Sequence, residues 1–139
     1  MKNTKTGALL LVMAFCLVIG CSRVYGPVEL AKAFAEEKEE VITQMGKTLE
    51  ANPTEAGVDE ARKVFEAKKD SLKAKRDAIK ASPQGFNVDW QTVLSETEAR
   101  HEQMMDAIGT QFRVACYSDS CTSKWAALEK DFKETVTRY

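Results

Sequence analysis

Hydrophobic residues recur every three or four positions along most of this chain, and polar residues fill the positions between them. In the segment from Val28 to Glu50, four of the six glutamates, Glu36, Glu37, Glu39 and Glu40, mostly flank the apolar positions. Such a stripe is typical of an amphipathic helix that buries one face. Its members are Ala31, Phe34, Ala35, Val41, Ile42, Met45 and Leu49.

Three further segments show the same period. The second begins near Asn52, which can cap the helix, and Pro53, which suits the first helical position, and it ends before the break from Ser82 to Asn87. Gly57 weakens its first turn, so the start could lie a few residues later. A turn from Tyr117 to Ser120 separates the third segment from a fourth that reaches Tyr139. The apolar positions are Ala61, Val64, Phe65, Leu72 and Ile79, then Trp90, Leu94, Met104, Met105, Ile108, Phe112 and Ala115, then Trp125, Leu128, Phe132, Val136 and Tyr139.

Helical segments joined by short connections predict an all-α fold, an antiparallel helical bundle of three to four helices over residues 28–139. Between Glu29 and Glu50 there are six acids and three bases, whereas between Glu55 and Lys80 there are six acids and eight bases. This opposite balance favours pairing of the first two helices. Lys68 and Lys75 occupy stripe positions, so their charges must extend to the rim of the helix.

The first twenty residues follow a different pattern. Lys2 and Lys5 precede an uncharged run from Gly7 to Gly20, which is short for a transmembrane helix of about 20 apolar residues. A positive start, an apolar run and small residues at its end predict a cleaved signal peptide over residues 1–20. An uncleaved signal-anchor is the alternative.

The residues Val18-Ile19-Gly20-Cys21 resemble the lipobox of bacterial lipoproteins, with Val where Leu is commoner. The resemblance implies cleavage between Gly20 and Cys21 and attachment of fatty acyl chains, such as palmitate, at Cys21. Two or three chains anchor a protein firmly, since each buried methylene contributes about 0.8 kcal/mol. Residues 21–27 would then be a lipidated N-terminus and short tether. Ser22, which is not Asp, implies the outer membrane under enterobacterial sorting, with the domain facing the periplasm.

Cys116 and Cys121 remain in the mature chain as an even pair. In an oxidising compartment such a pair can form a disulfide, which would fix the turn between the last two helices. Two free thiols are the alternative. The spacing matches neither a CxxC redox motif nor a zinc site.

Candidate chemistry is sparse. His101 is the only histidine, and it lies on the apolar stripe of the third helix beside Glu98 and Glu102. It is a weak candidate metal ligand, which would need partners such as Glu36 or Glu40 from another helix. Met104, Met105 and Phe112 could form an adaptable binding face, although core packing is the commoner use of such residues. No nucleophile motif, phosphate loop or CxxCH haem motif occurs, and a formal charge of −1 provides no field for nucleic acid.

We therefore expect a non-enzymatic helical lipoprotein without a cofactor, a binding or structural component of the cell envelope. Its acyl chains would contact the membrane, and its partner would be an envelope protein or peptidoglycan. The alternative is a carrier that holds a ligand or metal within the bundle through His101 and nearby acids.

Overall fold

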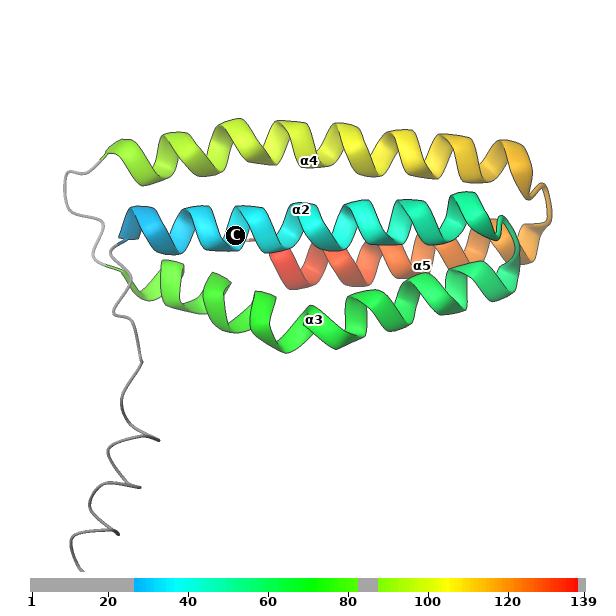
Figure 1. Cartoon of the computed structure of the whole chain (residues 1–139), viewed down its shortest axis with the longest axis horizontal. Helices are drawn as coiled ribbons and strands as arrows, with labels where there is room; N and C mark the ends of the chain where they lie inside the picture. The colour runs from blue at the N-terminus through cyan, green and yellow to red at the C-terminus, as the bar shows by residue number, and fades with distance from the viewer. Residues whose placement is uncertain (1–26, 83–87, 138–139) are drawn as a thin grey trace, which may run out of the picture.

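The structure, a computed structural model, describes residues 27–82 and 88–137, which form four α-helices. These are α2 (Pro27–Ala51), α3 (Glu55–Ala81), α4 (Val88–Ala115) and α5 (Asp119–Val136). They pack side by side as a four-helix bundle with three long helices and a shorter fourth (Figure 1). The predicted all-α bundle is confirmed. The predicted signal peptide (1–20), with Gly20, lies outside the described residues, as do Cys21 and the tether up to Gly26.

Helix direction alternates along the chain, but neighbours in space do not all run antiparallel. α2 packs on both α3 and α4, whereas α5 packs mainly on α3. In Figure 1, α2 and α4 run in the same direction. Gly46 of α2 faces Ile108 of α4, and Glu39 of α2 pairs with Arg100, so the numbering increases together on both helices. The chain thus passes from α3 to α4 between opposite corners of the bundle.

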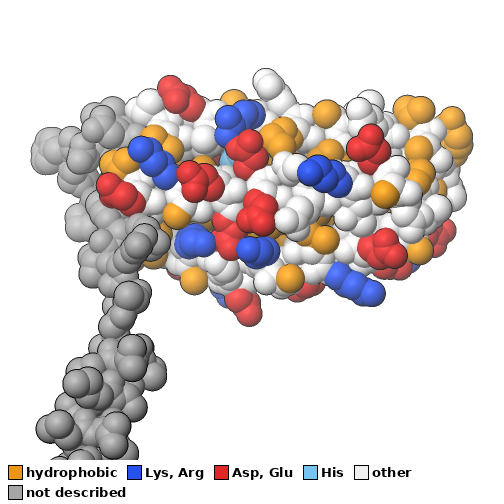
Figure 2. All heavy atoms as spheres, in the orientation of Figure 1, with side chains coloured by type: hydrophobic (Ala, Val, Ile, Leu, Met, Phe, Trp, Pro, Cys, Tyr) orange, Lys and Arg blue, Asp and Glu red, His pale blue; other side chains and the backbone are white. Residues whose placement is uncertain are grey.

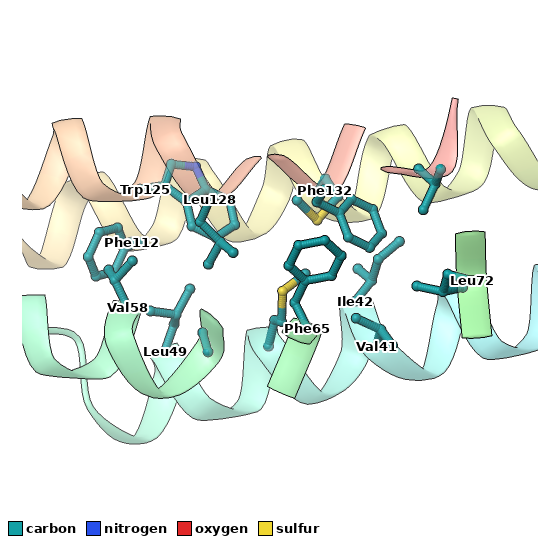
Figure 3. Packing of buried hydrophobic residues seen from close by; sticks show 14 of the residues in the cluster. Val41, Ile42, Leu49, Val58, Phe65, Leu72, Phe112, Trp125, Leu128 and Phe132 are labelled. Atoms are coloured by element: carbon teal, nitrogen blue, oxygen red, sulfur yellow. The ribbon is translucent and has the colours of Figure 1, made fainter. Parts of the chain in front are cut away.

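The predicted stripes form one continuous core. Figure 3 shows Phe65 and Phe132 facing each other at its centre, with ring centroids 5.5 Å apart in an edge-to-face arrangement. Ile42 and Leu72 lie nearby, and every one of these side chains is at most 2% exposed. Of the predicted positions that the structure describes, Ala115 is wrong, because α4 ends there and leaves its side chain exposed. The side chain of Trp90 and all of Tyr139 lie outside the described residues.

Charged side chains link α2 to α3, as their opposite balance predicts. Glu37 accepts hydrogen bonds from Lys75 and from the Ser71 hydroxyl, the latter over 2.9 Å, and Lys68 lies 3.8 Å away. Burial alone would raise the pKa of Glu37, but these hydrogen bonds and the two lysine charges together lower it. The charges of Lys68 and Lys75 reach the rim, as expected from their stripe positions.

The start of α3 differs from the prediction. The cap is Thr54, not Asn52, and its Oγ1 accepts a hydrogen bond from the Gly57 N–H over 3.3 Å. The same hydroxyl donates to Asn52 Oδ1 over 2.7 Å. A Cβ on Gly57 would lie 1.8 Å from the carbonyl oxygen of Asn52. The turn between α2 and α3 is therefore tight enough to require glycine there, which moves the helix start to Glu55.

α4 and α5 touch least among the neighbouring helices. They meet at their connected end, where Phe112 and Trp125 lie 6.2 Å apart between ring centroids. Trp125 also lies against Gly109, where a Cβ would come within 2.7 Å of the indole Nε1. The far end of α5 is held by α3 instead, because Arg76 donates hydrogen bonds to the carbonyl of Thr135 (2.7 Å) and to that of Glu134 (3.1 Å).

The surface carries mixed charge. Figure 2 shows acidic and basic side chains interspersed over the face centred on α2, and hydrophobic side chains gathered at the end where α4 finishes. Across the described ranges, none of the helices combines the length and apolar character needed to cross a bilayer.

Candidate functional site

His101 is the polar side chain that the bundle buries most completely, at 1% exposed among the described residues. It projects from α4 toward α2, where its Nε2 lies 3.5 Å from Glu39 Oε2. That separation is too long for a good hydrogen bond. Neither ring nitrogen has a hydrogen-bond partner within the described structure. Such an unsatisfied buried group costs about 1–3 kcal/mol, which makes His101 an exception among buried polar groups.

The surroundings of His101 favour the uncharged imidazole. Burial lowers its pKa most, and the positive charge of Lys38 lowers it further. Glu39 opposes both effects, and Arg100 adds a smaller lowering. His101 is therefore neutral at pH 7, with one ring nitrogen as a donor and the other as an acceptor.

A cavity of about 300 Å³ lies beside His101, between α4, α5 and α2. We call it the His101 cavity. Its walls are apolar side chains from α4 and α5, and Lys38 of α2 lies on its floor. Glu102, Lys133 and Thr137 are exposed at its mouth. The lining residues are Lys38, Glu98, His101, Glu102, Met105, Phe132, Lys133, Val136 and Thr137.

Lys38 was missed by the sequence analysis, although the sequence contains a signal for it. It lies three residues after Ala35 and three before Val41, on the apolar stripe of α2. A lysine at such a position either extends its charge to the rim or is buried with partners. Here it is buried, only 7% exposed.

The predicted partners of His101 divide into two groups. Glu98 and Glu102 do line the cavity, as neighbours on the same helix. Glu36 and Glu40 instead line a shallow depression on the outer surface of α2. Within residues 27–82 and 88–137, no three His, Cys, Asp or Glu side chains come together in a way that could hold a metal ion.

The methionine and phenylalanine cluster also divides. Met105 and Phe112 are buried in the core, at 3% and 2% exposed. Met104 is half-buried and, together with Phe112, lines a groove of about 460 Å³ between α2 and α4. We call this the α2–α4 groove. Lys47 and Ile108 also line it, and its far end lies beside Pro53.

Cys116 and Cys121 form the predicted disulfide, with 6.1 Å between their Cα atoms. The bond joins the end of α4 to the first turn of α5. Ser118 caps α5 there, since its Oγ accepts a hydrogen bond from the Cys121 N–H over 3.1 Å. The disulfide therefore fixes the connection between these two helices, as the spacing predicts.

Comparison with known proteins gives no relative for this chain: no protein-family model, curated protein or solved structure matches it.

Proposed function

We propose that this chain is a bacterial lipoprotein whose helical bundle is a non-enzymatic binding or structural component of the cell envelope. One observation carries the proposal. Lys2 and Lys5, the apolar run, Gly20 and Cys21 follow one another in the order that lipoprotein processing requires. Removal of residues 1–20 would leave Cys21 as an acylated N-terminus.

The start of the bundle is compatible with such an anchor. α2 begins at Pro27, so five residues, Ser22 to Gly26, separate Cys21 from the first helix. Even fully extended, a segment of this length spans less than about 20 Å. The bundle would be held close to the bilayer, where a tether raises the effective concentration against other membrane-bound partners. Modest affinity for an envelope protein or for peptidoglycan would then suffice.

Two measurements on one preparation test the proposal. The chain is produced in a Gram-negative host with its own N-terminus, crosslinked in the cell and purified from the membrane fraction. Mass spectrometry should find a mature N-terminal peptide that begins at an acylated Cys21, and crosslinks to envelope components. A Cys21→Ser variant should lose the acylated peptide and, because cleavage follows acylation, should retain residues 1–20. An unmodified thiol at Cys21, or retention of Met1, would refute the lipoprotein proposal.

A carrier of small molecules is the second candidate. It is favoured by the two unpartnered nitrogens of His101 beside the His101 cavity. Elemental analysis of the purified chain, together with native mass spectrometry, would detect a bound metal or organic ligand. Loss of that species on His101→Ala substitution would support this function.

A further inference from the structure

The corner between α4 and α5 is packed at one end and open at the other. At the connected end, Phe112 and Trp125 are buried against each other. Farther along, the His101 cavity of about 300 Å³ separates the two helices. Met105, Phe132 and Val136 on its walls are at most 4% exposed, and the mouth opens between polar side chains. A concave apolar space with a few polar groups is the usual form of a small-molecule site, and this volume is near the lower end of the range of roughly 300–1,000 Å³.

The polar groups of the cavity lie at two depths. Lys38 and His101 lie on the floor and are buried, whereas Glu102 and Lys133 are exposed at the mouth. The neutral imidazole of His101 has a free N–H to donate. The Lys38 ammonium carries three donors, so a ligand can join the partners that it already has. Two groups that carry donors, Lys38 and His101, therefore line the buried end of the cavity, and the Glu39 carboxylate lies 3.5 Å from His101 Nε2.

We propose that the His101 cavity binds a small organic monocarboxylate with a compact apolar body. The carboxylate would accept hydrogen bonds from the His101 ring and from the Lys38 ammonium. The hydrogen bond from Lys38 would be charge-assisted and therefore strong. The apolar body would lie against Met105, Phe132 and Val136. This inference goes beyond the membrane-anchored role and gives the carrier candidate a ligand class.

Charge at the mouth limits the ligand to one carboxylate. Glu98, which is half-buried, and Glu102, which is exposed at the mouth, both line the cavity and would repel a second negative group. Lys133 lines it too, but it is one positive charge against two negative ones, and its Nζ also pairs with Glu129 Oε1 over 2.7 Å. The site therefore discriminates against dicarboxylates of similar size.

His101 supplies a specific reporter, because it is the only histidine in the chain. The whole sequence is expressed without a histidine tag and is processed by the cell. The protein is labelled with ¹³C at histidine Cε1, so that NMR shows one signal. Benzoate should shift this signal saturably with a Kd at or below about 1 mM. Benzyl alcohol, which keeps the ring but lacks the charge, should bind at least about tenfold more weakly. Terephthalate, with a second carboxylate opposite the first, should also bind more weakly than benzoate.

Substitutions separate the floor of the cavity from the rest of the surface. Lys38→Met should weaken benzoate binding at least about tenfold. Lys47→Met is the matched control, since Lys47 is on the same helix but lines the α2–α4 groove, and it should leave the affinity unchanged. Glu102→Gln, at an exposed position, should strengthen terephthalate binding, and this variant serves even if Lys38→Met fails to fold.

Several outcomes would overturn the proposal. Absence of a saturable benzoate shift up to about 10 mM would show that the cavity is not a carboxylate site. Equal affinity for benzyl alcohol would refute the assignment of the anion, and equal loss in Lys47→Met would refute the location. None of these results depends on the lipid anchor, which the mass spectrum of the N-terminal peptide tests separately.

Discussion

Substitution of Gly57 by alanine tests the tight turn between α2 and α3. In most helices this change is stabilising by about 0.5–1 kcal/mol, because glycine loses more backbone freedom on folding. Here the added Cβ would lie 1.8 Å from the carbonyl oxygen of Asn52, whereas ordinary contact begins at 3.4 Å. The turn would have to move by about 1.6 Å to accept it. The blocking atom belongs to the backbone and cannot rotate away.

The size of the effect follows from two costs. Accommodating an extra methyl group in a crowded site costs about 1–3 kcal/mol. Moving the turn also disturbs the Thr54 cap, whose hydrogen bond to the Gly57 N–H is worth about 1 kcal/mol. After subtraction of the helix-propensity gain, Gly57→Ala should lower the free energy of unfolding by about 1–3 kcal/mol. A domain of this size has roughly 5–15 kcal/mol in total, so the loss is easily measured.

Urea unfolding followed by circular dichroism gives this free energy directly. The control is Ala56→Gly, at the exposed neighbouring position, which should lower stability by no more than about 1 kcal/mol. The two substitutions are chemically opposite, yet both should destabilise the fold. An unfolding free energy for Gly57→Ala equal to or above that of the unaltered protein would refute the tight turn.

Three further predictions concern the site, the disulfide and the core. Folding lowers the pKa of His101, so the unfolded chain takes up a proton at higher pH than the folded chain does. The free energy of unfolding should therefore fall as pH drops below about 6.5. His101→Gln should remove this pH dependence in urea unfolding measured at several pH values. Replacing Cys116 and Cys121 by serine should cost about 2 kcal/mol, estimated from the small loop they close; no loss in thermal unfolding would contradict this. Phe65→Leu and Phe132→Leu, made singly and together, should show a coupling energy of about 0.5–1.5 kcal/mol in the free energy of unfolding. Strictly additive losses of stability would refute a direct ring contact.

The helices and most of the core could be predicted because each depends on local sequence. The period of apolar positions defines the buried face of each helix, and almost all the predicted stripe residues within the described ranges are buried or half-buried. The pairing of α2 with α3 was predicted from their short connection and opposite charge, whereas the particular ion pairs of Glu37 with Lys68 and Lys75 were not. The disulfide followed from a lone cysteine pair across a turn.

Beyond the α2–α3 pair, the neighbours of each helix could not be predicted, because packing between distant segments leaves no periodic trace in the sequence. The parallel contact of α2 with α4 is such a feature, since it depends on how the chain crosses between α3 and α4. The Thr54 cap was missed because Asn52 and Pro53 give an equally good local signal, and only the close approach at Gly57 decides between them. The role of Lys38 needed the cavity, which exists only once three helices are assembled.

The open corner between α4 and α5 beside His101 is either a binding site or a packing defect, and substitution of His101 distinguishes the two. A packed corner would bring the neutral imidazole of His101 into still closer apolar contact without giving its nitrogens partners. His101→Leu, which removes both unsatisfied groups at similar size, should therefore raise the unfolding free energy by about 1–2 kcal/mol. The same variant should lose benzoate binding, measured by calorimetry. A gain in stability with a loss of binding is the trade-off that a functional site shows. A packing defect would show the gain in stability with no benzoate binding in either protein. Unchanged benzoate affinity in His101→Leu would leave the histidine without a role in recognition.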